Sequence, residues 1–217
     1  MSVNITFDLE TCALCPTAAV MSIGAVAWNA DAEDNPFITD GLFGDYCFYQ
    51  HVDLRSSFVD GFSFDKKTSD WWTTQNDDAK KSLLEYDAMP LRPIDNVIKD
   101  FFGFITWVQT ETSAKEVKLW SQGTDFDIAI LKNICAKYDM EIPISYKNFR
   151  DHRTFFMEGA KIICDNAGVE LDDSKAYLLV DEYDGPGEPH NPVYDCRRSI
   201  YSTWQMMKHL KSLAVNH

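Results

Sequence analysis

The spacing of apolar residues along the chain predicts a mixture of strands and helices. Short apolar runs fit strands, whereas apolar residues at every third or fourth position, as from Ile94 to Phe101, fit a helix that packs on a core. A hydroxyl at Thr68 or Ser69 and the carboxylate of Asp77 are expected to cap two short helices. The predicted strands are Val3–Leu9, Val20–Trp28, Tyr46–Val52 and Val117–Trp120. The first short helix is predicted over Thr68–Gln75, and the longer predicted helices are Pro93–Thr112, Phe126–Tyr138, Arg150–Ile163 and Val193–Leu213.

The order of these elements predicts the fold class. Three early strands joined by short links favour an antiparallel meander, and the later alternation of helix and strand is typical of an α/β protein. No internal repeat or low-complexity tract interrupts the 217 residues, and this length lies within the range of one domain. We therefore expect a single α/β domain over residues 1–217, with a mixed β-sheet flanked by helices.

Composition and charge narrow the class of protein. Hydrophobic residues make up 45% and charged residues 25% of the chain, as in ordinary globular proteins. The six cysteines show no paired framework, no apolar run approaches the length of a membrane span, and the N-terminus lacks a signal-peptide pattern. We therefore expect a cytoplasmic protein that does not bind membranes. The net charge of −14 disfavours a broad basic groove for duplex DNA, so a nucleic-acid site should be small.

Two carboxylates, Asp8 and Glu10, stand two positions apart in the first predicted strand. Since side chains alternate along a strand, both project to the same face, where they repel one another unless a cation or a proton intervenes. Asp127 at the start of a predicted helix and Asp195 in the first turn of the last helix add oxygen ligands of the kind that Mg²⁺ and Mn²⁺ prefer. The alternatives are a solvated edge strand and ordinary helix-capping acids, with Asp125 as the rival of Asp127 for capping.

A histidine and several less specific residues accompany the carboxylates. His190 follows the acidic, glycine- and proline-containing stretch Val180–Pro189, which we expect to have few backbone partners and to close over a bound ligand. A neutral imidazole is suited to take a proton from water. The pair Trp71–Trp72 is able to stack on bases, although burial of at least one ring in the core is the preferred interpretation. A zinc or redox role for Cys12-x-x-Cys15 lacks a second ligand pair or a redox context and is not favoured.

Together these motifs resemble the DEDDh branch of the DnaQ-like 3′–5′ exonucleases. Asp8–Thr11 resembles exonuclease motif I, Gly123–Asp127 resembles motif II, and His190 with Asp195 resembles motif III of the histidine subtype. The segments TSDWWTTQ, WSQG and RDHRT are similar to the group that contains the T-even phage exonuclease A and bacterial exoribonuclease-like proteins. The chain departs from the family pattern after motif I and within motif III, at Cys12, Ala13 and Pro192.

The resemblance implies an RNase H-like fold and a metal-dependent 3′–5′ exonuclease. Its expected products are nucleoside 5′-monophosphates from single-stranded DNA or RNA ends, with a slight preference for DNA. An exoribonuclease acting on RNA ends or short oligonucleotides is one alternative, and a catalytically silent nucleic-acid-binding protein is another. Whether the chain is a monomer or a homodimer is left open.

The resemblance also implies roles for individual residues. Two Mg²⁺ or Mn²⁺ ions are expected, with Asp8 bridging both. Glu10 and Asp195 would complete the shell of one ion, Asp127 would hold the other, and His190 would deprotonate the attacking water. The candidate substrate-binding residues are Thr11, Phe126, Arg150, Arg153, Arg197 and Arg198.

Overall fold

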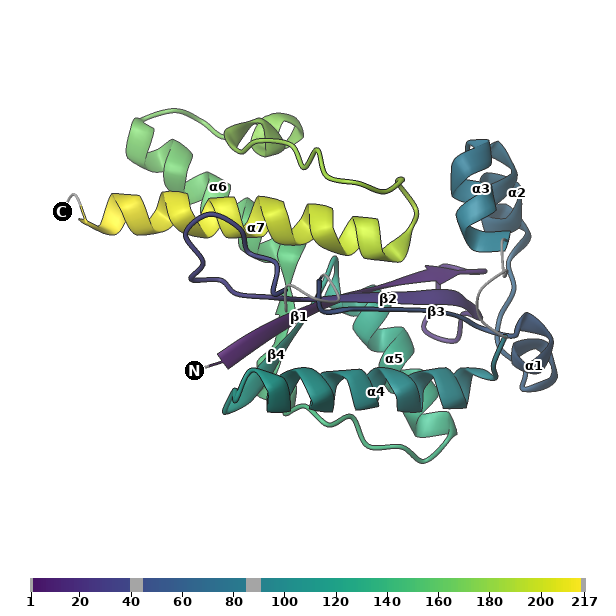
Figure 1. Cartoon of the computed structure of the whole chain (residues 1–217). Helices are drawn as coiled ribbons and strands as arrows, with labels where there is room; N and C mark the ends of the chain where they lie inside the picture. Colours follow the sequence, from purple (N-terminus) through teal and green to yellow (C-terminus); the bar gives the residue numbers. More distant parts are fainter. Residues whose placement is uncertain (1, 40–44, 85–90, 216–217) are drawn as a thin grey trace.

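A mixed five-stranded sheet organises the protein (Figure 1). The computed structural model describes residues 2–39, 45–84 and 91–215. Its strands are β1 (Ser2–Thr11), β2 (Val20–Trp28), β3 (Cys47–His51), β4 (Glu116–Ser121) and β5 (Phe149–Asp151), in the order β3-β2-β1-β4-β5. The first three pair antiparallel, whereas β4 and β5 continue the sheet in parallel with β1. The predicted early meander and mixed sheet are confirmed, and β1 is the central strand.

Helices cover both faces of this sheet (Figure 1). The α-helices are α1 (Leu54–Val59), α2 (Lys66–Thr74), α3 (Asp77–Leu84), α4 (Ile94–Glu111), α5 (Ala129–Lys137), α6 (His152–Ala167) and α7 (Pro192–Val215). Shorter turns are η1 (Thr124–Ile128, a π-helix), η2 (Tyr146–Asn148) and η3 (Asp173–Leu179), the last two being 3₁₀ helices. α4 and α5 pack on one face of the sheet, and α6 and α7 lie on the other. Within the described ranges, no helix has the length and apolar character needed to cross a membrane.

The two faces of β1 differ in chemistry. Apolar residues such as Phe7 face the core formed with α4 and α5. The opposite face carries buried polar side chains that have partners: Trp120 Nε1 donates to Asn4 Oδ1 at 2.9 Å, and Trp28 Nε1 donates to Thr6 Oγ1 at 3.0 Å. This polar face continues toward the C-terminal end of β1, where it meets the start of α7.

A glycine allows α7 to approach the sheet closely. Gly24 on β2 pairs with Asp8 on β1. A Cβ atom at Gly24 would lie 2.6 Å from backbone atoms of Pro192 and Val193, which is closer than real side chains pack. The absence of a side chain therefore lets the first turn of α7 rest on the sheet beside the β1 carboxylates.

Two predicted helix caps are wrong. α2 begins at Lys66 because the Asp65 carboxylate accepts the Thr68 N–H at 3.2 Å, so the hydroxyl at Thr68 is not the cap. Asn76 takes the place predicted for Asp77, because its Oδ1 accepts a backbone N–H of α3 at 2.7 Å. The observed caps lie three residues before Thr68 and one residue before Asp77, since neighbouring side chains of similar chemistry compete for the same N–H groups.

Candidate active site

Four carboxylates from three separate segments converge at the end of β1. Asp8 and Glu10 lie on the face of β1 that meets α7, as their alternation predicts. Asp127 reaches the same strand, because its Oδ1 accepts the Leu9 N–H at 3.3 Å. Asp195 lies in the first turn of α7. The structure therefore brings together all four carboxylates that the sequence singled out.

Asp127 lies in a π-helical turn, whereas a regular helix was predicted there. Asp151 holds this turn in place: its Oδ2 accepts the Thr124 N–H at 2.8 Å, and its Oδ1 accepts the Thr154 N–H at 2.9 Å and so caps α6. Asp125, the rival acid, is exposed. π-turns of this kind are frequent at functional sites. Asp151 is thus a positioning residue, whereas the sequence predicted only a helix, Arg150–Ile163, at this place.

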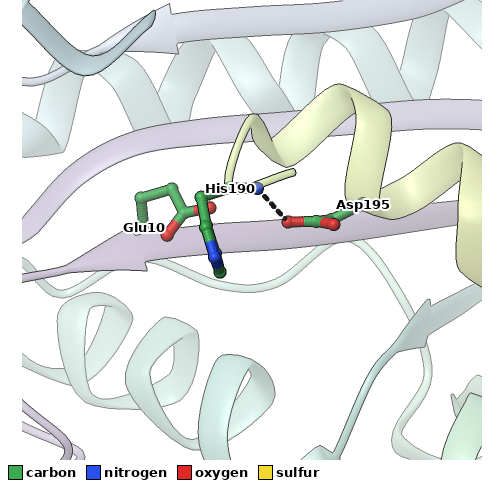
Figure 2. A group of neighbouring side chains, drawn as sticks. All are labelled: Glu10, His190 and Asp195. Carbon is green, nitrogen blue, oxygen red and sulfur yellow. Dashed lines mark hydrogen bonds between the residues drawn. The ribbon is translucent and has the colours of Figure 1, made fainter. Parts of the chain in front are cut away.

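His190 completes the cluster. One ligand atom each from Glu10, His190 and Asp195 lie within 4.8 Å of one another, and Figure 2 shows the three side chains meeting between β1 and α7. The His190 backbone N–H donates to Asp195 Oδ2 at 3.0 Å, drawn as a dashed line in Figure 2. The φ angle of His190 is 67°, a left-handed conformation that costs free energy for residues other than glycine. The strained backbone is held in place by the same carboxylate that lies beside the imidazole.

The departure from the family pattern at Pro192 has a local explanation. Pro192 is the first residue of α7, a position where its fixed φ suits a helix and its missing N–H is not needed. Asn191 caps the helix, since its Oδ1 accepts the N–H groups of Val193 and Tyr194 at 3.0 and 3.3 Å. The substitution therefore strengthens the start of the helix that presents Asp195.

Burial raises the pKa values of all four carboxylates and is the largest cause at each. It raises the pKa of Glu10 to about 8 and that of Asp127 to about 7. Burial and then the charges of Asp127, Glu10 and Asp195 raise the pKa of Asp8 well above its usual range. The pKa of Asp195 is also raised by burial, although Arg198 opposes the rise. The protein's own cations therefore do not neutralise the cluster.

The donor set fits a divalent cation. Asp195 Oδ1 is buried and accepts no hydrogen bond from any described residue, although an Arg198 nitrogen lies 3.1 Å away. Ser22 pairs with Glu10 across β1 and β2. Its Oγ is also buried and has no hydrogen-bond partner within the described part of the chain. Buried oxygens without partners cost free energy, and hard oxygen ligands suit Mg²⁺, Mn²⁺ or Ca²⁺. A bound cation would supply the missing positive charge.

The metal-free protein is expected to lose stability as the pH rises. A carboxylate whose pKa is raised by folding stabilises the protein fully below its unfolded value, and this stability is lost as the pH rises through the folded value. For Asp127 and Glu10 the window runs from 3.8 or 4.5 up to about 7 or 8. In EDTA, the free energy of unfolding should fall by at least about 2 kcal/mol from about pH 5 to about pH 8.5. Urea unfolding across this range measures it, and a stability independent of pH would contradict the assigned cluster.

Two of the four predicted arginine contacts lie near the carboxylates. Arg198 pairs with Asp195 at 3.1 Å and is 53% exposed at its side chain, so most of its donors are open to a ligand. Arg153 is exposed, donates to the Gln122 carbonyl at 3.4 Å and lowers the pKa of Asp127 against the larger effect of burial. Both therefore hold exposed cationic groups close to the carboxylates.

The other two arginines have different partners. Arg197 forms a partly buried ion pair with Asp45 at 2.8 Å. Arg150 donates to the carbonyl oxygens of Lys147 and Phe149 at 2.7 and 2.8 Å. The guanidinium groups of Arg197 and Arg150 are therefore engaged within the protein, and the structure does not gather them with the carboxylates.

The Trp71–Trp72 pair lies against His190. The two indole rings meet the imidazole edge to face, with centroid distances of 5.0 and 5.8 Å, and Trp72 Nε1 donates to the Thr11 carbonyl at 3.1 Å. Trp71 is 44% exposed and Trp72 is half-buried, so the interpretation that at least one of them belongs to the core is wrong. Two adjacent tryptophans within the predicted helix Thr68–Gln75 were the sequence signal for this wall of the site.

A cavity of about 750 Å³, here called the α2 cavity, opens beside the end of β1. Its wall includes Cys12, Met21, Val52, Phe64 and Trp72. Two other predicted substrate-binding residues do not line this cavity. Thr11 is buried and donates through Oγ1 to the Ala13 carbonyl at 2.9 Å, while Phe126 is partly buried against the main hydrophobic core. Neither Cys12 nor Cys15 belongs to the cation-binding group found among the described residues.

The segment before His190 is better anchored than its composition predicts. The Asp181 N–H donates to Gln205 Oε1 at 3.1 Å, and Gln205 Nε2 returns a bond to the Asp181 carbonyl at 2.8 Å. Tyr183 is 9% exposed and packs against three other aromatic rings. The expectation of few backbone partners along Val180–Pro189 is therefore wrong for its first half, because a long-range contact with α7 fixes it.

Comparisons with known proteins agree with this architecture. The family model of the 3′–5′ exoribonuclease Rv2179c-like domain matches residues 3–202. The crystal structure of cell-death related nuclease 4 (CRN-4) is similar over 95% of this chain and 64% of its own, with 14% identity and a TM-score of 0.59. The nuclease domain of 3′hExo, a DEDDh family member bound to rAMP, is similar over 95% of this chain and 92% of its own, with 13% identity and a TM-score of 0.51. A comparison with curated proteins found no match.

The structural matches establish the fold. At 13–14% identity they show an RNase H-like α/β architecture, which confirms the predicted fold class. This chain spans less than two thirds of the CRN-4 chain, since it covers 64% of it. The family match extends from β1 into α7, and so it encloses every segment that contributes to the carboxylate cluster.

Proposed function

We propose an exoribonuclease activity for this chain, which belongs to the family of 3′–5′ exoribonuclease Rv2179c-like domains. In this proposal the protein removes nucleoside 5′-monophosphates one at a time from the 3′ end of single-stranded RNA. The observation that carries the proposal is the convergence of Asp8, Glu10, Asp127 and Asp195 with His190 at the end of β1. The sequence motifs alone slightly favoured DNA, whereas the family description gives reason to place RNA first.

Proteins of this family depend on divalent metal ions. We propose Mg²⁺ or Mn²⁺ at two positions, with Asp8 shared between them, Glu10 and Asp195 on one and Asp127 on the other. Bound ions would stabilise the negative charge that develops on the phosphate and on the leaving oxygen. The raised pKa values of the four carboxylates show that the protein alone does not stabilise their charged form. A nearby cation would stabilise that form, which supports the assignment.

His190 is proposed as the general base. Its neutral imidazole would take a proton from the water that attacks phosphorus, while the bond between phosphorus and the upstream 3′-oxygen breaks and that oxygen leaves. Trp71 and Trp72 flank the ring, and its backbone is tied to Asp195. These contacts limit the orientations open to the imidazole, and the orientation of a base is what a proton transfer requires.

The α2 cavity is proposed to hold the terminal nucleoside. It begins at Cys12, next to the carboxylates, and Trp72 and Phe64 give it an aromatic wall. A base stacks on such side chains with little regard to sequence. A small pocket for one nucleoside also agrees with a net charge of −14, since it needs few phosphate contacts.

Matched RNA and DNA strands of one sequence test the proposed substrate. We expect RNA to be shortened at least about tenfold faster than DNA, a difference of about 1.4 kcal/mol, and we expect a 3′-phosphate to block both. Equal rates would remove the preference for RNA but leave the exonuclease assignment intact. Cleavage of the blocked strand at the unblocked rate would indicate an endonuclease instead.

A further inference from the structure

We propose that a second cavity, between α6, η3 and α7, binds the nucleobase on the 5′ side of the scissile phosphate. This cavity, here called the α6–α7 cavity, has a volume of about 650 Å³, within the range of small-ligand sites. The inference rests on the proposed function, because it assigns a place to the nucleotide that remains on the strand after cleavage.

The α6–α7 cavity borders the carboxylate cluster. Arg198 lines the cavity and also touches Asp195. Gln122 lines it too and lies two residues before Thr124, the first residue of the turn that carries Asp127. The Ser199 hydroxyl donates to Gln122 Oε1 at 3.2 Å, which joins these two segments along the rim. The cavity and the carboxylate cluster therefore share Arg198 as a common boundary.

The chemistry of cleavage assigns the direction of the strand. In an in-line displacement, the attacking water and the leaving 3′-oxygen lie on opposite sides of phosphorus. Along the chain leading into α7, His190 precedes Asp195, while Arg198 and Ser202 follow it. Ser202 lies about 10 Å further along the helix than Asp195, at about 1.5 Å per residue. The nucleotide that carries the leaving oxygen should thus lie toward the α6–α7 cavity, away from His190.

The lining of this cavity suits a base better than a chain of phosphates. Phe156 and Tyr177 stack with a centroid distance of 4.4 Å and an interplanar angle of 9°, and Tyr177 leaves 47% of its surface exposed. Arg198 provides one cationic contact for a single phosphate, whereas Asp181 and Glu182 add carboxylates to the lining. Carboxylates accept hydrogen bonds from the amino groups of bases but repel additional phosphates. The cavity therefore fits one nucleobase with one phosphate at its entrance.

Tyr177→Ala tests the proposal, with Tyr146→Ala as the control, since Tyr146 is 76% exposed and does not line the cavity. Two substrates distinguish an effect on the cavity from an effect on the catalytic site. One is a short RNA, and the other is a nucleoside 5′-phosphate p-nitrophenyl ester, which has no upstream base. We expect Tyr177→Ala to lower kcat/KM on the RNA by about five- to fiftyfold, the usual effect of removing a base-stacking side chain. The ester should be hydrolysed at the wild-type rate.

An RNA with an abasic penultimate nucleotide tests whether Tyr177 acts through the base on the 5′ side of the scissile phosphate. For the wild-type protein, kcat/KM on the abasic RNA should be lower than on the intact RNA by about the factor that Tyr177→Ala causes. For Tyr177→Ala, kcat/KM on the abasic RNA should be little lower than on the intact RNA. Unchanged kcat/KM on the RNA, equal losses on RNA and ester, or additive losses with the abasic strand would each overturn the proposal. Normal RNA shortening by Tyr177→Ala would leave the proposed function standing. A wild-type protein that shortens no RNA would overturn both.

Discussion

Asp8→Asn is expected to reduce the turnover of nucleic acid by about a thousandfold or more. Asp8 is the carboxylate that faces three others, so its loss weakens every cation position in the cluster. Losing several kcal/mol of transition-state stabilisation corresponds to this factor. The same change should raise the Tm of the protein in EDTA by a few degrees, because an amide removes the free-energy cost of burying and protonating this carboxylate on folding. It should also abolish most of the increase in Tm that Mg²⁺ or Mn²⁺ gives the wild-type protein.

Asp125→Asn is the matched control for this variant. Asp125 is exposed and lies two residues from Asp127. The substitution Asp125→Asn therefore removes a charge from the same motif without changing the carboxylate cluster. Its turnover and its response to cations should resemble those of the wild-type protein. Near-normal turnover in Asp8→Asn would show that the carboxylate cluster is not the catalytic site.

His190→Ala is expected to lower turnover by about 10²- to 10⁴-fold, the usual range for loss of a general base. Cation affinity, measured by calorimetric titration, should change little, because four carboxylates remain. Since a nitrogen of His190 lies within 4.8 Å of oxygens of Glu10 and Asp195, the imidazole is also placed to bind a cation itself. A large loss of affinity in His190→Ala would therefore make His190 a ligand and would contradict its assignment as the base.

The backbone of His190 calls for a second variant. Its φ of 67° is tolerated better by asparagine than by alanine, so His190→Asn should keep the local conformation while it removes the base. We expect both variants to lose turnover to a similar extent. His209→Ala, at an exposed position of α7, controls for loss of a histidine and should be fully active. Recovery of turnover in His190→Asn would show that the backbone, and not the imidazole, causes the loss.

The sequence predicted the centre of the site because its geometry is local. Strand alternation is enough to place Asp8 and Glu10 on one face, and a first-turn position is enough to orient Asp195. The order of the motifs indicated that Asp127 joins them. The close approach of α7 to β2 at Gly24 follows no local rule, and it required the folded chain.

Other parts of the site depend on contacts between distant residues. The bonds of Asp151 to two separate segments and the pairing of Asp181 with Gln205 join positions that show no periodicity in common. The packing of Trp71 on His190 spans more than a hundred residues. Composition predicted a poorly held loop before His190, since glycine, proline and acidic residues give no sign of a partner on a later helix.

The most direct test of the account follows a 5′-labelled single-stranded RNA with a free 3′-hydroxyl, incubated with the wild-type protein in Mg²⁺ and in EDTA. The account predicts stepwise shortening by one nucleotide at a time from the 3′ end in Mg²⁺, release of nucleoside 5′-monophosphates, and no shortening in EDTA. Internal fragments in Mg²⁺, or the same shortening in EDTA, would contradict a cation-dependent exonuclease site built on these carboxylates.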